Sequence, residues 1–419
     1  MTFSAFELND WQQFDSIKMD LSAPVTIITG TNGSGKTTLV SLLSSQFGAR
    51  FVSHATPMVS DDGEVSYTSG FWGHVGGFLS RLFDKPDPNI VGTIKFEDGN
   101  ETKLKTPNNV SAQYIMEYLP RRPVPGIFLP SHRPSFLYQK VSNINTGNKK
   151  SRNEAYHEFN NKVSQPAQTG GYIGLEIKTT LLKWLIDGSG VKQGDHWARP
   201  RHAESENNYI GFMNLLRNFL PPTVGFDRFE FKDDELVFVC KDGRDQFLLE
   251  TASGGVTTLI SLAWLLYNFS QDNPSFTLIV DEIEHHLHPS LQREILGMIH
   301  RSFPKVKIIV TTHSPLVVNS VENAKVYALR PNERDRIEVL ELPLKDKLAT
   351  ANRILDDVLG VGAPYPIWAE RKIDSILSRY LEQPFNQDVA QKLQIELENE
   401  GVGELMHAAL GKWLDAQNQ

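Results

Sequence analysis

Short, largely apolar runs are the clearest hydrophobic pattern along this chain. Val25 to Thr29, Phe276 to Val280 and Val306 to Thr312 are each dominated by aliphatic, aromatic or β-branched residues. Such runs are typical of strands buried in a parallel sheet. After the first run comes a glycine-rich loop, and then Leu39, Val40, Leu42, Leu43 and Phe47 recur at helical spacing. The alternation of strand and helix predicts an α/β fold with a parallel sheet.

Other segments alternate or turn in ways that predict antiparallel strands. Ile90 to Phe96 and Thr102 to Lys105 flank a turn at Asp98-Gly99, and Phe229 and Phe231 alternate with polar residues ahead of Leu236 to Cys240. Ile127 to Leu129 is a candidate for a further core strand, which ends at Pro130-Ser131-His132-Arg133. Gly70 to Phe78 matches no phosphate-loop spacing and is interpreted as a flexible insertion.

Helical patterns fill the middle and the end of the chain. We expect helices over Leu175 to Ile186 and Ile210 to Leu220, and a helix that follows Ser253 to about Phe269. Near the end, two apolar faces are expected, one at Ile373, Ile376, Leu377, Tyr380 and Leu381, the other at Leu405, Met406, Ala409, Leu410 and Trp413.

Composition narrows the class of protein. The 419 residues are 40% hydrophobic and 22% charged, as in an ordinary globular protein. We expect a cytoplasmic protein, because there is no apolar run of membrane-spanning length and no secretory signal. The single cysteine, Cys240, excludes an internal disulfide. A net charge of −8 argues against broad, non-specific binding of nucleic acid. Lys149 to Arg152 and Arg199 to His202 remain candidates for a local basic groove, although solvated loops explain them more simply.

The loop after the first apolar run carries the most specific motif. Gly30-Thr31-Asn32-Gly33-Ser34-Gly35-Lys36-Thr37 fits GxxxxGK[ST] and lies between a predicted strand and a predicted helix. Glycines allow backbone N–H groups to line a nest for phosphate oxygens, Lys36 would reach the β- and γ-phosphates, and the Thr37 hydroxyl would ligate Mg²⁺. The nucleotide-binding residues predicted here are Gly30, Asn32, Gly33, Ser34, Gly35, Lys36, Thr37 and Thr38.

Three later segments supply the remaining chemistry. Asp281 and Glu282 follow a buried strand, where Asp281 would hold Mg²⁺ and Glu282 would act as general base for the attacking water. Ser253, Gly254 and Gly255 open a helix, so Ser253 can cap it and the glycines expose backbone to an anion. His313 follows the last buried run and can bond a γ-phosphate oxygen or the water.

With these motifs in order, the chain resembles the ABC-type ATPases. It is most similar to the branch that includes OLD-family proteins and the ATPase subunits of the Septu and PARIS antiphage systems. Segments Gly30–Thr37, Ser253–Val256, Asp281–Pro289 and Thr312–Pro315 carry the resemblance, and so does the turn Glu284-His285-His286-Leu287-His288-Pro289. The stretches Asn352–Leu355 and Val358–Gly360 also look similar to such subunits.

The resemblance implies a composite site. Ser253 and Gly254 would cap, in trans, the γ-phosphate held at Lys36 of a second chain, so ATP would join two protomers into a homodimer or an oligomer built from dimers. Transporters usually carry Leu and Gln where this chain has Ala252 and Val256. A phage protein or a nucleic-acid feature would trigger the cycle of ATP-driven closure and hydrolysis. No membrane partner is expected.

Several alternatives stay open at this point. The interval between Lys36 and Ser253 is about half the chain, which is long for a transporter, and heptads of an SMC-like coiled coil are missing. A RecF-like DNA repair ATPase is the alternative function, and DNA binding is left open. About a quarter of the chain follows His313 and holds no Asp-x-Asp pair or His-Asn-His arrangement, so a separate TOPRIM or HNH nuclease is expected as effector.

A histidine cluster and one glutamine are further candidates for metal chemistry. His285, His286 and His288 with Glu284 could suggest zinc, but HExxH is absent and the cluster fits the loop that crosses to a partner chain. Gln139 is a candidate for a glutamine that senses Mg²⁺.

The predicted fold is therefore an α/β, ABC-type P-loop NTPase with a mixed and parallel core sheet, an antiparallel β subdomain, helical insertions and a helical C-terminal region. We expect an N-terminal ATPase lobe at 1–140, a helical insertion at 141–225, a lobe with the signature, the carboxylates and His313 at 226–345, and a helical region at 346–419.

Overall fold

The structure is a computed structural model of the full chain. It describes residues 2–48, 51–59, 65–68, 89–107, 111–133, 136–144, 147–164, 172–233, 235–342, 367–380, 387–406, 409–410 and 413. The glycine-rich stretch Gly70 to Phe78 and the segments Asn352–Leu355 and Val358–Gly360 lie outside the described residues. The chain forms two compact units, Met1–Lys347 and Leu348–Gln419. The finer division of the first unit into lobes and insertion stays a prediction.

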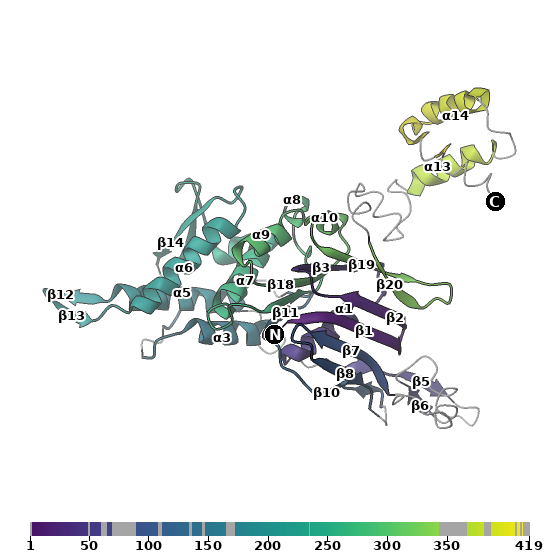
Figure 1. The fold of residues 1–419 in the computed structure, drawn as a ribbon. Coiled ribbons are helices and arrows are strands. Elements are labelled where there is room, and N and C mark those ends of the chain that lie inside the picture. The colour runs from purple at the N-terminus through teal and green to yellow at the C-terminus, as the bar shows by residue number, and fades with distance from the viewer. Residues whose placement is uncertain are drawn as a thin grey trace. The chain divides into compact units, whose positions relative to one another are not determined.

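Five parallel strands form one half of the main sheet, in the order β19 (Lys325–Pro331), β3 (Val25–Gly30), β18 (Lys307–Thr312), β17 (Thr277–Val280) and β11 (Gly126–Leu129). All residues of β3, β18 and β17 are buried, as their apolar runs predicted. The alternation of strand and helix along the chain therefore yields the expected parallel core (Figure 1).

Antiparallel strands continue the same sheet on its other side. Their order is β10 (Glu117–Leu119), β8 (Glu101–Lys105), β7 (Ile90–Phe96), β1 (Phe3–Trp11) and β2 (Phe14–Asp20), after which β20 (Ile337–Glu341) leads into β19. The pairing of Phe14 with Ile337, which is parallel, joins β2 to β20. One apolar cluster contains Phe6, Ile28 and Leu329, so both halves share a core. The antiparallel part is thus continuous with the nucleotide-binding sheet.

The helix after β3 lies against the parallel strands. Helix α1 (Lys36–Ser44) contacts β3, β18, β17 and β11, and a short 3₁₀ turn, η1 (Ser45–Phe47), ends it. Leu39, Val40, Leu42 and Leu43 are fully buried, which confirms the helical spacing read from the sequence.

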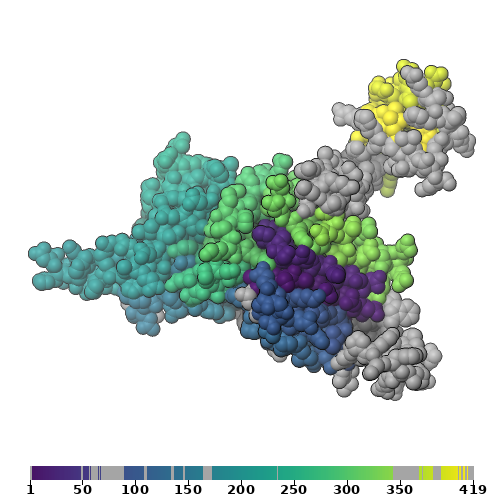
Figure 2. All heavy atoms as spheres, in the orientation of Figure 1, coloured from purple at the N-terminus to yellow at the C-terminus, as the bar shows by residue number. Residues whose placement is uncertain are grey.

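A group of helices forms the middle of the chain. It comprises α3 (Arg152–Ser164), α5 (Ile173–Ser189) and α6 (Ala203–Phe219), which pack with α7 (Gly254–Phe269). The Trp264 ring of α7 lies 5.5 Å from that of Trp184 and 4.8 Å from that of Phe212, between centroids. An exposed hairpin, β12 (Val191–Gln193) and β13 (His196–Arg199), joins α5 to α6. Figure 2 shows this teal region extending away from the purple and blue N-terminal strands.

A separate three-stranded antiparallel sheet precedes α7. It contains β14 (Phe226–Lys232), β15 (Glu235–Cys240) and β16 (Asp245–Leu248), followed by the 3₁₀ turn η2 (Leu249–Thr251). The strand pair expected at Phe229 and at Leu236 is confirmed, and β16 is an addition that its half-exposed residues did not reveal.

The remaining elements are short. They are β4 (Ser53–His54) with β9 (Gln113–Tyr114), β5 (Thr56–Val59) with β6 (Val65–Thr68), and the helices α8 (Pro289–Gln292), α9 (Ile295–Ser302) and α10 (Pro315–Val318). Among the described residues, none of the helices has both the length and the apolarity that crossing a membrane requires.

The second unit holds α13 (Ile367–Leu377), α14 (Gln387–Asn399) and η3 (Gly403–Leu405). Ile373, Ile376 and Leu377 are buried with Ala409 and Trp413 in one cluster, as the two apolar faces predicted. Leu381, which was expected on the first face, lies outside the described residues.

Candidate nucleotide-binding site

Three predicted motifs meet at one edge of the parallel sheet. Strands β3, β18 and β17 are neighbours, and their register pairs Thr29 with Thr312 and Val280 with Val310. Because the three strands are parallel, their carboxyl ends lie at the same edge. The loop from Gly30, the Asp281-Glu282 pair and His313 are therefore adjacent in space, although the sequence separates them widely.

The glycine-rich loop has the backbone of a phosphate nest. Gly30, Gly33 and Gly35 have φ of 147°, 79° and 90°, which side chains rarely permit. A Cβ on Gly35 would lie 2.4 Å from Cζ of Phe14, so this position also lacks room for a side chain. The Ser34 hydroxyl is buried and has no hydrogen-bond partner within the part of the chain that the structure describes. The loop thus fits an anion that offers an acceptor to these groups.

Lys36 lies at the base of this loop, and its ammonium points back into it. Nζ donates to the carbonyl oxygens of Gly30 at 3.0 Å and Thr31 at 2.9 Å. Burial lowers the pKa of Lys36 to about 8, against the raising effect of Asp281, Glu282 and Glu284. The lysine is therefore a buried amine in the nest, and the charges of three carboxylates act on it. Of the other loop residues, Asn32 and Thr37 are exposed and Thr38 is half-buried.

Oxygen atoms suited to a magnesium ion face each other beside the nest. The Thr37 hydroxyl donates to Oδ2 of Asp281 at 2.9 Å, and the Thr311 hydroxyl donates to Oδ1 of Asp281 at 2.5 Å. Hydroxyl and carboxylate oxygens are hard ligands of the kind that Mg²⁺ selects, usually together with substrate phosphates. The residues present fit the ion, with Thr37 and Asp281 as the groups that would hold it.

Glu282 is held in an unusual backbone conformation. Its φ is 47°, in the left-handed region, which costs a non-glycine residue about 1–3 kcal/mol. Its N–H donates to the Thr311 hydroxyl at 2.8 Å. The side chain is 36% exposed and lies 3.7 Å from Nδ1 of His285. The carboxylate is therefore partly open to solvent.

His313 and Glu284 are linked across the same edge. The backbone N–H of His313 donates to Oε1 of Glu284 at 2.6 Å. Burial, and then the charge of Lys36, lowers the pKa of His313. The imidazole is consequently neutral near pH 7 and can accept or donate one hydrogen bond. Glu284 therefore fixes the loop that carries His313.

Ser253, Gly254 and Gly255 lie at the start of α7. Ser253 occupies the N-cap position as predicted, but its side chain makes no capping hydrogen bond. Ser253 and Gly254 are exposed. A Cβ built on Gly254 would lie 3.5 Å from Cβ of His286, so the signature packs against the loop after Glu282. The N-terminus of α7 thus offers the Ser253 hydroxyl, which is not used for capping, and backbone N–H groups to an anion from another molecule.

The histidine cluster has structural partners. The rings of His285 and His286 lie edge to face with centroids 4.1 Å apart. His288 caps α8 by accepting a hydrogen bond from the Ser290 N–H. Gln139 lies beyond β11, and its backbone carbonyl oxygen accepts a hydrogen bond from Lys178 at 2.7 Å. A role for its side chain in sensing Mg²⁺ stays a prediction.

Two residues of the site had no role in the sequence interpretation. Thr311 bridges Asp281 and the Glu282 N–H, and Arg133 donates from Nη2 to the carbonyl oxygens of Asp281 at 3.0 Å and Glu282 at 3.1 Å. Burial lowers the pKa of Arg133 to about 10, which leaves it charged near pH 7. Arg133 follows β11, the neighbour of β17, so a polar residue just after a buried strand was the available signal.

The two basic stretches form ion pairs within the chain. Lys149 and Arg199 pair with Asp187, and Lys150 pairs with Glu176 at 2.5 Å. Arg201 pairs with Glu206. These contacts favour a structural role for the stretches.

Family models match both motif-bearing parts of the chain. Residues 178–319 match the family described as "AAA domain, putative AbiEii toxin, Type IV TA system". Residues 6–114 match a second family, described as "AAA domain". The two matches contain the signature, the carboxylate pair, His313 and the phosphate loop.

One relative extends the match over most of the chain. The Septu protein PtuA of Bacillus thuringiensis is 34% identical over 365 residues, which are 83% of this chain and 81% of that protein. The retron Ec83 probable ATPase of Escherichia coli is 25% identical over 188 residues, 43% of this chain and 33% of that protein. This chain therefore spans a third of the retron protein's length.

Among solved structures, an SMC head bound to the C-terminal winged-helix domain of ScpA is similar with a TM-score of 0.43 and 15% identity. The match covers 83% of this chain and all of that one.

Proposed function

Because the chain belongs to the family of the Septu protein PtuA, ATPases of antiphage defence, we propose that it hydrolyses ATP at a site completed by a second copy of itself. The observation that carries this proposal is that Ser253, at the start of α7, is exposed and its side chain makes no capping hydrogen bond, on the same chain as the phosphate nest at Lys36. Two such chains related by a twofold axis would form two composite sites, each with one nest and one signature.

Each residue has a defined role in this site. The backbone of the nest and Lys36 bind the phosphates, and Ser253 and Gly254 of the second chain close over the γ-phosphate. A bound Mg²⁺ would offset charge on the β- and γ-phosphates. Glu282 takes a proton from the attacking water as general base, and His313 hydrogen-bonds the γ-phosphate or that water. Thr311 holds Asp281 and the Glu282 backbone in register during the reaction.

The wider role follows the family. We propose that ATP-driven closure makes the chain a sensor and scaffold that controls a separately encoded nuclease of TOPRIM or HNH type. A phage-derived trigger would bias the equilibrium between open and closed forms. The family relationship supports this defence role over a RecF-like repair ATPase. The pure chain should then cleave no DNA when Mg²⁺ or Mn²⁺ is added, and cleavage by it would contradict a separate effector.

Mixing two inactive variants tests the composite site. Lys36→Ala removes the nest cation, and Ser253→Arg blocks the exposed signature. In a mixed dimer, the intact phosphate nest of the Ser253→Arg chain faces the intact signature of the Lys36→Ala chain. ATP hydrolysis should therefore reappear on mixing, towards a quarter of the parental rate for random pairing with one working site in half of the dimers. If the mixture stays as inactive as its components, the signature does not act in trans.

A further inference from the structure

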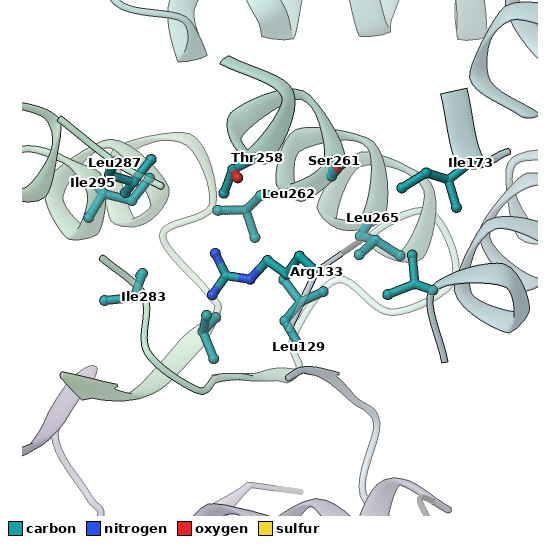
Figure 3. Close-up of a pocket in the computed structure, with 12 residues that line it drawn as sticks. Leu129, Arg133, Ile173, Thr258, Ser261, Leu262, Leu265, Ile283, Leu287 and Ile295 are labelled. Carbon is teal, nitrogen blue, oxygen red and sulfur yellow. The ribbon is translucent and has the colours of Figure 1, made fainter. Parts of the chain in front are cut away.

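Arg133 is a charged side chain placed in an apolar pocket. The pocket lies between α7 and the ends of β11 and β17, and Leu129, Leu262, Leu265, Val280, Ile283 and Leu287 line it. Figure 3 shows the guanidinium among Leu262, Ile283 and Leu129, with the Arg133 side chain extending through the cavity. Moving a charge out of water into such surroundings is unfavourable unless hydrogen bonds compensate for it. The contacts of the guanidinium therefore indicate its role.

Those contacts are to backbone carbonyl groups at the reacting edge. Nη2 lies 3.0 Å from the carbonyl oxygen of Asp281 and 3.1 Å from that of Glu282, and Nε lies 3.3 Å from that of Pro130. The arginine thus bridges two consecutive carbonyl groups, which belong to the residues that would hold Mg²⁺ and activate water. It does so across 148 and 149 positions of the chain.

The bridged carbonyl groups fit the left-handed backbone conformation of Glu282. Two successive carbonyl oxygens can point to one donor when the residue between them has helical dihedral angles, and Glu282 has the left-handed version, with φ of 47°. On the opposite side, the Glu282 N–H is held by the Thr311 hydroxyl at 2.8 Å. The Ile283 N–H also donates to the Thr311 carbonyl oxygen at 3.2 Å, and the Glu282 carbonyl oxygen also accepts from the His285 N–H at 3.1 Å. The two peptide groups that flank Glu282 are therefore held at four polar atoms, which fixes the direction of its Cα–Cβ bond.

We propose that Arg133 is a positioning residue for ATP hydrolysis: its guanidinium holds the Glu282 backbone in the left-handed conformation that aims the carboxylate at the attacking water. The proposal rests on the proposed role of Glu282 as general base. It requires a guanidinium rather than any cation, because only a planar fork presents several N–H donors in fixed directions, whereas an ammonium is a point charge on a flexible stem.

The test separates catalysis from binding. Arg133→Met keeps the apolar volume and Arg133→Lys keeps the charge. In both, kcat for ATP hydrolysis should fall by about 100-fold, the size of effect expected when a reacting group is misplaced by about 1 Å. The Kd for ATP, measured separately with Mg²⁺ present, should stay within about twofold, because the phosphate nest is untouched. Millimolar guanidinium should restore part of kcat in Arg133→Ala, and methylammonium should not.

Arg152→Met is the matched control. Arg152 is another partly buried arginine, which stacks 3.8 Å from the centroid of the Tyr267 ring and donates to the Ser270 hydroxyl, away from the site. Its loss should lower the melting temperature without changing kcat. If Arg133→Met does not fold, Arg133→Lys and the guanidinium rescue of Arg133→Ala decide the question.

Glu282→Gln, assayed in parallel, distinguishes this inference from the function on which it rests. If Glu282→Gln hydrolyses ATP at the parental rate, the base assignment itself is wrong. If Glu282→Gln is inactive but folded Arg133→Met retains the parental kcat, so that any loss of kcat/KM comes from a weaker affinity for ATP, then Arg133 does not position Glu282.

Discussion

The hydroxyl of Thr37 donates a hydrogen bond to the carboxylate of Asp281 at 2.9 Å, although 244 positions separate the two residues in the chain. This contact joins the first turn of α1 to the end of β17. It also brings together the two oxygen atoms that fit a magnesium ion beside the phosphate nest. The nest and the carboxylate pair therefore form one site within a single chain.

Replacing Thr37 by alanine should remove one side of that magnesium site. We expect Mg²⁺-dependent ATP hydrolysis to fall on the order of 100-fold, because charge on the transferring phosphoryl group is then poorly stabilised. A titration of ATPase rate against Mg²⁺ checks this. Thr37→Ser retains the hydroxyl and should retain most of the rate. An alanine variant with the parental rate and the parental Mg²⁺ dependence would contradict the assignment.

The buried Lys36 makes ATP binding sensitive to alkaline pH. Burial lowers its pKa to about 8 in the nucleotide-free chain, and bound phosphates should raise it again. Above pH 8 the free chain therefore loses the proton, and binding has to restore it. The affinity for ATP should fall by up to about tenfold per pH unit from pH 8 upward, with proton uptake measurable by calorimetry in buffers of different ionisation enthalpy.

Stability should change in the opposite direction over the same range. The usual pKa of a lysine is 10.5, so between about pH 8 and 10.5 the unfolded chain binds more protons than the folded one. Lys36 therefore contributes a free energy of unfolding that rises with pH in this window. Lys36→Arg is the control, since arginine stays charged throughout and should show neither trend. An ATP affinity that is constant from pH 7 to 9 would contradict the predicted titration.

How much of the site could be predicted depends on the distance in sequence over which its contacts act. The loop from Gly30 to Thr37 was readable because its function lies in one continuous segment with a strict spacing. The buried runs that begin at Val25, Phe276 and Val306 likewise predicted their strands, since burial on both faces leaves an apolar signature. The residues that carry chemistry at the end of each individual strand were therefore predictable.

Contacts between distant segments could not be read in the same way. Thr311 is the penultimate residue of β18 and resembles any β-branched core residue, yet its hydroxyl bridges Asp281 and Glu282. Arg133 reaches Asp281 only because β11 pairs with β17 in the register of Leu129 with Val280. Strand order and register arise from tertiary packing, which a single sequence does not specify.

A buried ion cluster couples the helical insertion to the segment before the signature. Lys178 of α5 is fully buried, and its Nζ lies 2.6 Å from Oε1 of Glu250 and 3.0 Å from Oε2 of Glu235. Glu250 belongs to η2, which leads directly into Ser253. Removal of the cation would leave Glu250 buried without its opposite charge.

Lys178→Met should therefore lower the free energy of unfolding by about 3–5 kcal/mol. Urea denaturation followed by tryptophan fluorescence measures this. The double variant Lys178→Met/Glu250→Gln should recover part of the lost stability, because it also removes the carboxylate that the single variant leaves buried without an opposite charge. If the double variant is no more stable than Lys178→Met alone, the pairing of these two residues is not what stabilises the junction.

ATP is expected to join two chains through the exposed signature at Ser253. Glu282→Gln should bind ATP without hydrolysing it and should accumulate in the closed form. The most direct measurement is the light-scattering mass of this variant with and without ATP and Mg²⁺, for a chain of 47.2 kDa. We expect ATP to raise the mass to that of a dimer or a multiple of dimers, or to stabilise such a species against dilution. A variant that binds ATP yet keeps the mass of a single chain would contradict it.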